Sequence, residues 1–460
     1  MKKIYFIFIL TLTASFANAQ WAGFTNTGGD ELWSNDANWA FPGGVTELAP
    51  GQKIDIYQGP TTVTLDEAYT AKGLKMPANK AESFTLTGAE KLIIDIADGT
   101  QGNDVSGLKA IANDSSDPTT LTLDCDVTIA NTATIDQFKG VSVCNINGHP
   151  DSKVIFDSSK TLEIAGTGTT SFWGFGEFHV NGTLIGAQGI LVGGGAGGGI
   201  LYLGSSTSDV SGFTGALTLA NESELTLQSN GSSTINNIKV QLNGNVGKLT
   251  LESENVLNSN EIRVSTKAGQ AFILNMFVNA NQTLQGIKIK GDGSTLNLNI
   301  GSGVTSVAFG ANNANWHANS IINIIGYKEG VVKFGTDNTS LNGGAYLANI
   351  RIDGQQAPMG EPLSLDAEGN LIGAASLVLS TEKHNAFQFS MYPNPVKEII
   401  NFNTKEPLAS AKVYDLLGKE VLKISQPISN INVSSLNRGL YVLQLEAKNG
   451  GLVTRKFIKE

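Results

Sequence analysis

Residues 217–227 read LTLANESELTL, and the pattern in this short stretch decides the fold. At residues 217–219 and again at 225–227, two leucines flank a threonine, so apolar and polar side chains alternate. Alternation with a period of two is typical of a β-strand with one buried face, and the intervening Asn and Ser are typical turn residues. The stretch therefore predicts two short strands joined by a tight turn.

The same pattern recurs along most of the chain. Many very short strands with small turns predict an all-β fold, a right-handed parallel β-solenoid (β-helix) over residues 20–380, in which each coil buries its inward residues against the next. A string of β-sandwiches is the alternative, but it needs longer strands of about five to six residues. The further alternating segments are residues 62–65, 84–87, 121–123, 141–143, 154–156, 162–164, 178–180, 201–203, 249–251, 287–289, 296–298, 322–324 and 331–334.

The composition excludes some functions. The chain of 460 residues contains 53 glycines, and charged residues make up only 16% of it. The net charge of −10 is uneven, because residues 1–20 carry +2 and residues 387–460 carry +4, which leaves −16 for the body between them. An acidic body repels phosphate backbones, so we expect no nucleic-acid partner. The body contains two arginines, Arg263 and Arg351, which are far apart in sequence. A cluster of arginines that would bind an anionic substrate is therefore not predicted.

Aromatic and apolar residues gather near both ends of this body. The sequence LWSNDANW at residues 32–39 resembles the opening of autotransporter-like passenger proteins, and residues 334–371 resemble their closing segment. The resemblance implies a surface-exposed or secreted β-helical passenger. Trp33 and Trp39 would cover the first coil, because an uncovered end exposes strand edges. The residues that would cover the last coil are Tyr346, Leu347, Ile350 and Ile352.

Residues 1–19 read MKKIYFIFILTLTASFANA and have the three parts of a secretory signal peptide. Two lysines precede an apolar run at residues 4–12, and Ala17-Asn18-Ala19 is a small-x-small cleavage site. The apolar run is too short to span a bilayer stably, which argues against the alternative of a membrane anchor. We therefore expect export across the inner membrane, with Gln20 as the mature N-terminus and no later membrane-spanning segment.

The composition and pattern of the sequence change near residue 387, where lysine becomes more frequent, glycine becomes less frequent, and the alternating segments lengthen. Seven strands are predicted in residues 387–460, which indicates a small Ig-like β-sandwich. These strands are expected at residues 387–391, 399–402, 411–414, 420–424, 431–433, 441–446 and 453–458.

Short motifs follow one another in this last segment. They are Tyr392-Pro393-Asn394-Pro395, then Tyr414-Asp415 with Gly418, then Gly439 with Tyr441, and finally Arg455-Lys456. In this order they closely resemble the type A C-terminal sorting domain of the type IX secretion system, which is found in Bacteroidota-type bacteria. The resemblance implies that the outer-membrane translocon binds this domain in the periplasm. It also implies a secreted or outer-surface location, with the passenger either released or attached to surface lipopolysaccharide.

Two cysteines and several acid pairs are candidates for cross-linking and cation binding. Cys125 and Cys144 are 19 residues apart, which would place them about one coil apart, and an exported chain can oxidise them. A disulfide and two buried free thiols both remain open.

The pairs Asp124/Asp126 and Glu252/Glu254 would each put two carboxylates on one strand face, which suits calcium or glycoside hydrolysis unless they are solvated outward residues. No cofactor is predicted, and calcium is the one cation that the acidic body would suit.

The sequence lacks other catalytic signatures. The histidines are scattered and no HExxH or CxxC motif occurs, so no zinc site is predicted. The glycine-rich run at residues 193–199 is not followed by the Lys-Ser/Thr of a phosphate loop, and a tight turn is expected there. A group of aromatic residues would either stack on sugars or pack in the core. They are Phe172, Trp173, Phe175 and Phe178, with Trp316 beside His317.

Two hypotheses follow for the body. The favoured one is a non-catalytic surface or secreted protein for adhesion, glycan binding or surface structure, because charge is low and no catalytic cluster is visible. The other is a polysaccharide lyase or glycoside hydrolase on a β-helix, which rests on architecture alone. Extracellular glycans are one partner that both hypotheses allow, and a protein or another surface is also open for the first.

Overall fold

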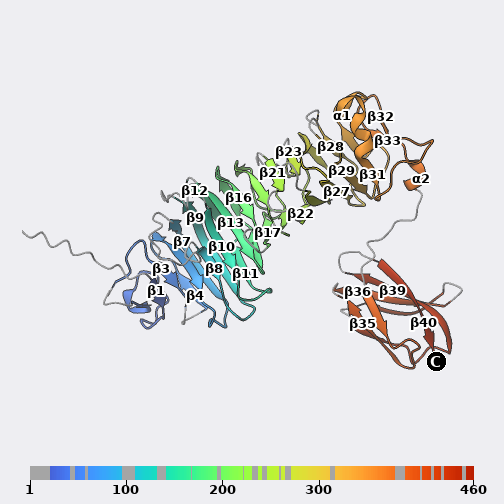
Figure 1. Cartoon of the computed structure of the whole chain (residues 1–460). Helices are drawn as coiled ribbons and strands as arrows, with labels where there is room; N and C mark the ends of the chain where they lie inside the picture. The colour runs from blue at the N-terminus through green and yellow to red at the C-terminus, as the bar shows by residue number, and fades with distance from the viewer. Residues whose placement is uncertain are drawn as a thin grey trace, which may run out of the picture. The chain divides into compact units, whose positions relative to one another are not determined.

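The chain is all-β and divides into two compact units, residues 1–377 and residues 378–460. Figure 1 shows both units in a computed structural model. The structure describes residues 21–41, 47–56, 61–95, 109–131, 141–166, 168–193, 198–220, 222–229, 237–240, 246–257, 261–264, 271–310, 316–378, 389–404, 407–415, 419–425, 429–447 and 452–460. The predicted signal peptide at residues 1–19 lies outside the described residues.

Two large parallel sheets dominate the first unit. In the described residues, the twelve-strand sheet is parallel apart from the antiparallel pair of β1 with β2. Its strands are β1 (Trp21–Phe24), β2 (Trp39–Ala40), β3 (Lys53–Asp55), β6 (Gly73–Met76), β8 (Lys109–Asn113), β10 (Val141–Ile146), β13 (Thr169–Gly174), β16 (Ile190–Val192), β19 (Leu217–Leu219), β21 (Asn237–Val240), β23 (Glu261–Val264) and β26 (Gly286–Ile289).

The sixteen-strand sheet is parallel throughout its described pairs. Its strands are β4 (Thr62–Thr64), β5 (Tyr69–Ala71), β7 (Phe84–Asp95), β9 (Thr120–Asn131), β11 (Lys153–Phe156), β12 (Thr161–Gly166), β14 (Glu177–Val180), β15 (Thr183–Gly186), β17 (Ile200–Leu203), β18 (Gly212–Phe213), β20 (Glu224–Leu227), β22 (Val246–Leu251), β24 (Ile273–Val278), β27 (Thr295–Ile300), β29 (Ile321–Ile325) and β31 (Ile350–Ile352).

Smaller elements complete the first unit. Strands β25 (Gln282–Leu284), β28 (Val307–Phe309) and β30 (Val332–Phe334) form a third parallel sheet, and β32 (Ser364–Leu365) pairs antiparallel with β33 (Leu371–Ile372). The helical turns are η1 (Asp36–Asn38), α1 (Ser340–Gly343), η4 (Ala345–Asn349) and α2 (Ala375–Val378). No helix among the described residues is both long and apolar enough to cross a membrane.

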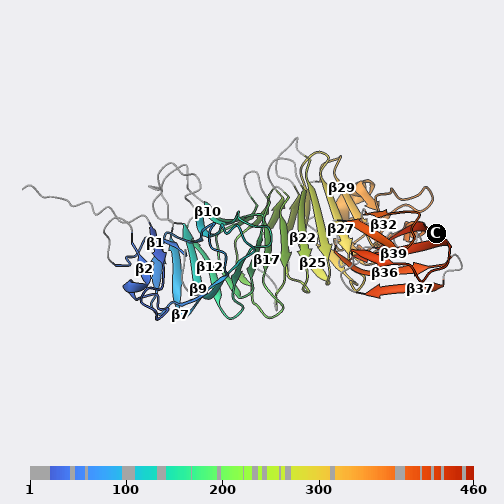
Figure 2. The ribbon, with the colours of Figure 1, turned by 90° about the horizontal axis from the view of Figure 1, so that it is seen from below.

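Successive strands of each large sheet stack as rungs, because the chain passes repeatedly from one sheet to the other. Figures 1 and 2 show the strands following one another in chain order along the first unit. Val154, Phe178, Leu201 and Leu225 lie in register on neighbouring strands, at nearly equal spacings along the sequence. All four are buried in one hydrophobic core that extends from Ala22 to Ala374. Stacked apolar rows of this kind bury each rung against the next.

Two strands are longer than the alternating pattern predicts. β7 and β9 each span 12 residues, and the register of β7 against β9 shifts between Thr87 and Lys91. Gly88 lies at this shift with a φ of 157°, and a Cβ there would approach the carbonyl oxygen of Leu65 to 2.3 Å. Only glycine fits so close to the neighbouring backbone, so the strand bends here instead of ending in a turn.

Aromatic residues pack at the two ends of the first unit. The rings of Trp33 and Trp39 meet edge to face with centroids 4.8 Å apart, and Trp39 Nε1 donates to the Trp33 carbonyl at 2.8 Å. At the other end Tyr346 stacks on Trp316 with centroids 5.2 Å apart. β31, which contains Ile350 and Ile352, is the last strand of the sixteen-strand sheet.

Of the two possibilities for Cys125 and Cys144, the structure shows the second, because both are buried free thiols. Cys125 lies on β9 of the sixteen-strand sheet, whereas Cys144 lies on β10 of the twelve-strand sheet. The residues one rung from Cys144 are Ile111 and Phe172, and both are farther from it in sequence than Cys125 is. The expected placement one coil apart was wrong, because the interval between the cysteines is shorter than one rung and leads to the opposite sheet.

The second unit contains all seven predicted strands. Two antiparallel sheets contribute to one hydrophobic core that includes Phe402, Val413, Leu443 and Phe457. The three-strand sheet is formed by β34 (Phe389–Tyr392), β35 (Ile399–Thr404) and β38 (Asn430–Asn432). The four-strand sheet is formed by β37 (Glu420–Ser425), β36 (Leu408–Tyr414), β39 (Gly439–Ala447) and β40 (Leu452–Lys459), in that spatial order.

Candidate functional site

The first motif of the second unit lies against the end of the last strand, β40. Asn394 Oδ1 accepts a hydrogen bond from the backbone N–H of Ile458 at 2.9 Å. Val396 N–H donates to the Ile458 carbonyl at 2.8 Å, and Glu460 N–H donates to the Val396 carbonyl at 2.9 Å. The prolines of Tyr392-Pro393 and Asn394-Pro395 both follow cis peptide bonds. The Tyr392–Pro395 motif thus joins the end of strand β40.

The middle motif shapes one strand end and its turn. Tyr414 lies at the end of β36, and its hydroxyl donates to Gln444 Oε1 on β39 at 3.3 Å. Asp415 Oδ1 accepts from the backbone N–H of Lys419 at 3.0 Å. Gly418 lies outside the described residues. The carboxylate of Asp415 therefore holds the turn between β36 and β37.

The remaining motif residues divide between core and surface. Gly439 begins β39, where the buried Tyr441 stacks on Phe457 with centroids 5.6 Å apart. Arg455 is exposed, with its guanidinium 5.8 Å from the ring centre of Phe389, and Lys456 is exposed on the same strand. The aromatic pair is structural, and the two cations are available at the surface.

Residues 390–460 match the model of one protein family, described as the secretion system C-terminal sorting domain. The second unit is therefore a type IX secretion C-terminal sorting domain. Such a domain directs export to the cell surface or the extracellular space, and it implies interaction with the type IX secretion machinery. A search among curated proteins found no match to this chain.

In the first unit, the outward side chains of the sixteen-strand sheet line up in two columns, because the strands are parallel and in register. We call this surface, from β11 to β31, the outer face. The first column is Lys153, Glu177, Ile200, Glu224, Lys248, Asn275, Asn297, Asn323 and Arg351. The second column is Ile155, His179, Tyr202, Thr226, Thr250, Phe277, Asn299 and Ile325.

Four polar residues connect three rungs at one end of the outer face. Glu177 accepts hydrogen bonds from Lys153 Nζ at 2.8 Å and from His179 Nε2 at 2.9 Å. Partial burial raises the pKa of Glu177, but these bonds outweigh it and hold that pKa below its usual value. Burial, together with the charges of Glu177 and Glu224, raises the pKa of Tyr202. The ring of His179 stacks on Tyr202 with centroids 4.5 Å apart and planes 8° apart.

Farther along the outer face, the columns continue as pairs and a ladder. Lys248 Nζ lies 2.8 Å from Glu224 Oε2 and 5.8 Å from the ring centre of Phe277. Asn297 Nδ2 donates to Asn275 Oδ1 at 2.8 Å, and Asn323 Nδ2 donates to Asn297 Oδ1 at 3.2 Å. The outer face therefore presents stacked rings, amides and hydroxyls, and its lysines and glutamates are paired, whereas Arg351 bonds to backbone carbonyls.

In the acid pairs considered for calcium or glycoside hydrolysis, Asp124, Asp126 and Glu252 accept hydrogen bonds within the protein. Asp124 accepts from Thr87 Oγ1 at 2.7 Å and lies 3.6 Å from Lys160 Nζ, while Asp126 Oδ1 accepts from the N–H of Thr161 at 2.8 Å. Glu252 and Glu254 follow the end of β22, so they lie in a turn and not on a strand face as predicted. Within the described ranges, no three His, Cys, Asp or Glu side chains gather as a metal site.

The predicted aromatic group separates into core and surface residues. Phe172 and Phe178 are fully buried and meet edge to face at 5.2 Å, and Trp316 is also buried. Phe175 is 65% exposed and lies between β13 and β14. Phe172 and Phe178 thus pack in the core, which is the second of the two expectations.

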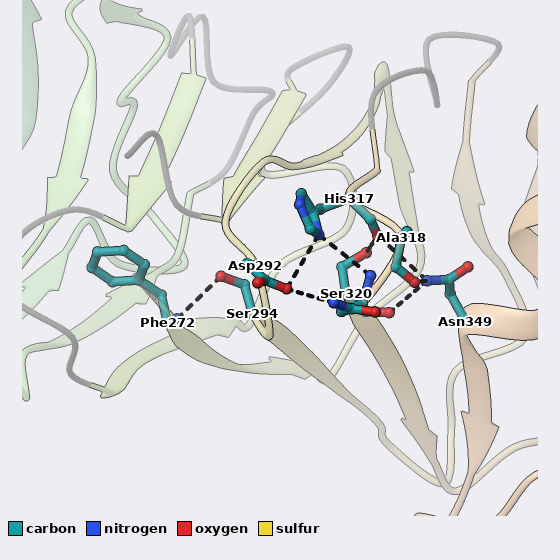
Figure 3. A network of polar contacts seen from close by, with 8 residues as sticks. Phe272, Asp292, Ser294, His317, Ala318, Ser320 and Asn349 are labelled. Atoms are coloured by element: carbon teal, nitrogen blue, oxygen red, sulfur yellow. Dashed lines mark hydrogen bonds and ion pairs between the residues drawn. The ribbon is translucent and has the colours of Figure 1, made fainter. Parts of the chain in front are cut away.

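Of the scattered histidines, for which no zinc site was predicted, His317 lies in a network of polar contacts (Figure 3). Its Nδ1 is 3.4 Å from Asp292 Oδ1, and its carbonyl accepts from Ser320 Oγ at 2.7 Å. Asn349 Nδ2 donates to the carbonyls of Ala318 and Ser320 at 3.0 and 2.7 Å. These contacts connect the turn before β29 to the turn before β31, so the network holds neighbouring rungs together.

The two arginines of the first unit lie on different sheets and do not form a shared anion site. Arg263 lies on β23 of the twelve-strand sheet, whereas Arg351 lies on β31 of the sixteen-strand sheet and donates to the Ala348 carbonyl at 2.7 Å. Arg263 pairs with Glu261, which also lies 2.5 Å from Lys288 Nζ. The side chain of Glu261 is only 4% exposed, and the two cations beside it balance its buried negative charge.

The outer face was not predicted from the sequence, although its signal is visible there. His179, Tyr202, Thr226 and Thr250 are the central residues of alternating triplets that the sequence identifies as strands. They follow one another at nearly equal intervals, so the spacing of the triplets would have placed them in one column.

Proposed function

We propose that the exported passenger is a non-catalytic β-solenoid that binds extracellular glycans through its outer face. A closed solenoid is supported by the alternation of the chain between two parallel sheets around one core, and a right hand is the general rule for parallel crossovers. An Ig-like β-sandwich is likewise supported for the sorting domain by its two antiparallel sheets. Residues 1–19 would provide the signal for the first membrane.

The stacked rings of His179 and Tyr202 carry the proposal of glycan binding. Each ring covers one face of the other, and the aromatic surface that remains is apolar area that can pack on the C–H groups of a sugar ring. Adjacent amides and hydroxyls can bond to sugar hydroxyls. The outer face offers both at regular intervals, since neighbouring strands lie about 4.8 Å apart. An extended polysaccharide would therefore meet the same kinds of group on successive rungs.

Neutral glycans are the favoured class. The charged side chains Lys153, Glu177, Glu224 and Lys248 are paired with one another on this surface. Paired charges give little attraction for a charged polymer, and the net charge of −16 on the body repels anionic glycans. Binding would thus depend on stacking and on hydrogen bonds.

The test uses the full chain purified after export, titrated with neutral polysaccharides and assayed in parallel for release of reducing or unsaturated sugars. We expect binding without turnover, and about tenfold weaker binding for Tyr202→Ala, which corresponds to about 1.4 kcal/mol. Phe175→Ala is the matched control, since it removes an exposed aromatic ring that lies off the outer face. Saccharide turnover would instead support a polysaccharide lyase or glycoside hydrolase, and equal losses in both variants would refute the outer face as the site.

A further inference from the structure

One face of the sorting domain's four-strand sheet points away from the core, and its residues follow from the strand alternation. Leu443, Leu445, Val453 and Phe457 are buried, so their neighbours along β39 and β40 point outward. We call this outward surface the basic face. Its residues are Ser410, Lys412, Tyr414, Lys423, Leu440, Val442, Gln444, Glu446, Thr454, Lys456 and Ile458.

The basic face carries three lysines and one glutamate, Glu446, whose carboxylate accepts from Ser410 Oγ at 2.8 Å. Lys412 and Lys423 lie directly opposite one another on β36 and β37. Like charges in directly opposed positions destabilise a sheet. Within the described part of the chain, Lys412, Lys423 and Lys456 have no ion-pair partner. No ion pair among the described residues offsets this repulsion, which suggests that the lysines are retained for a negatively charged partner.

Two apolar side chains lie on the same face. Leu440 and Ile458 are directly opposed on β39 and β40, and they are 37% and 48% exposed. The neighbouring opposed pair along the two strands is Val442 with Lys456. The apolar pair thus lies at one end of the basic face, beside Lys456. Exposed apolar side chains next to charged residues are common at protein–protein interfaces.

The outward surface of the three-strand sheet is different. Its central residues are four asparagines, Asn401, Asn403, Asn430 and Asn432, with Ile399 opposite Asn432. The net positive charge of the domain is therefore not spread evenly over its two sheets. The clustering of lysines on one sheet needs its own explanation.

We propose that the basic face is the surface by which the sorting domain docks on the secretion machinery, and that its partner is an acidic protein surface with an apolar recess. The recess would receive Leu440 and Ile458, and the acidic groups would pair with Lys412, Lys423 and Lys456. Charge complementarity of this kind steers association and selects the partner. The inference rests on the export function of the domain and adds the face and the partner chemistry.

Lys412→Glu in the full chain, expressed in a host with a type IX system, separates docking from folding. The variant replaces a repulsive pair with an attractive one opposite Lys423, so the melting temperature of the sorting domain should stay the same or rise. Extracellular protein should nevertheless fall by at least about fivefold, with the chain retained in the periplasm. Leu440→Ser should reduce export in the same way by removing half of the apolar pair.

Asn403→Glu is the control for an added carboxylate, because it places one on the outward surface of the three-strand sheet and keeps every lysine of the basic face. Normal export of Lys412→Glu, or equal loss with Asn403→Glu, would overturn the proposal while leaving the export function intact. A further measurement addresses a lipid partner. If the full chain sediments with anionic phosphatidylglycerol vesicles, and Lys412→Glu abolishes this without lowering export, the basic face binds a membrane surface and the protein partner is refuted.

Discussion

The two units treat their surface charges differently. On the outer face of the passenger, lysines pair with glutamates on neighbouring rungs, as in Lys153 with Glu177 and Lys248 with Glu224. On the basic face of the sorting domain, Lys412 opposes Lys423, and neither has an ion-pair partner among the described residues. A surface that pairs its own charges needs no charged partner, whereas one that leaves them unpaired suits an acidic partner. The following predictions test this contrast, from the largest effect to the smallest.

Removing residues 389–460 should abolish export, because the sorting domain supplies the route across the outer membrane. The passenger should accumulate in the periplasm, which immunoblots of cell fractions and medium would detect. The full chain expressed in the same strain is the control. Passenger found outside the cell after the deletion would contradict the assignment.

Truncating one buried aromatic residue should destabilise only the unit that contains it. Phe178→Ala in the passenger and Phe457→Ala in the sorting domain should each cost about 3–5 kcal/mol, since both rings are fully buried. Hydrogen exchange measured by mass spectrometry in urea would follow each unit separately. Equal loss of protection in both units, from either substitution, would show that they unfold together.

Asn297→Ala interrupts the ladder from Asn275 to Asn323 and should cost about 1–2 kcal/mol, because it leaves neighbouring amide groups without partners. Asn403→Ala, on the exposed surface of the sorting domain, should change stability by less than about 0.5 kcal/mol. Urea denaturation of the full chain gives both values. Equal effects would mean that the ladder adds nothing to rung stacking.

Lowering the pH should reduce the stability of the passenger, because it protonates Glu177 on the outer face. The folded pKa of this group lies below its ordinary value, so its contribution to stability is complete above the unfolded pKa. The contribution is lost as the pH falls through the folded pKa. The difference in melting temperature between wild type and Glu177→Gln should therefore shrink from pH 7 to pH 3, and a constant difference would contradict it.

The cysteines provide the smallest effect. Burial raises the pKa of the Cys125 thiol to about 12 and also raises that of Cys144, so neither should react with a thiol reagent in the folded chain. Two thiols should titrate after denaturation without a reductant. A mass lower by two hydrogens in the exported protein would show instead that the two cysteines form a disulfide.

The fold was predictable to the extent that it depends on local pattern. Each alternating triplet places its two flanking residues inward whatever the distant contacts are, so segments such as 225–227 were recognised as strands. All seven strands of the sorting domain were found in the same way. The pattern failed at β7, where Gly88 carries one strand through a bend that resembles a turn in the sequence.

The sites were less predictable, because they join residues that are far apart in the sequence. Asn394 bonds to Ile458 across 64 residues, and the two were related only through the order of motifs in a family. The His179–Tyr202 stack depends on a rung spacing that varies along the chain. The separation of the two cysteines was misread as one rung for the same reason.

The sequence by itself determined the all-β class, the change of texture near residue 387 and the sorting motifs, because alternation, composition and short motifs are local properties. Only the tertiary structure decided which outward residues share a face. The register between rungs depends on the length and bending of every intervening turn, and a strand pattern does not specify these. The pairing of charges on the passenger and the opposed lysines on the sorting domain are consequences of that register.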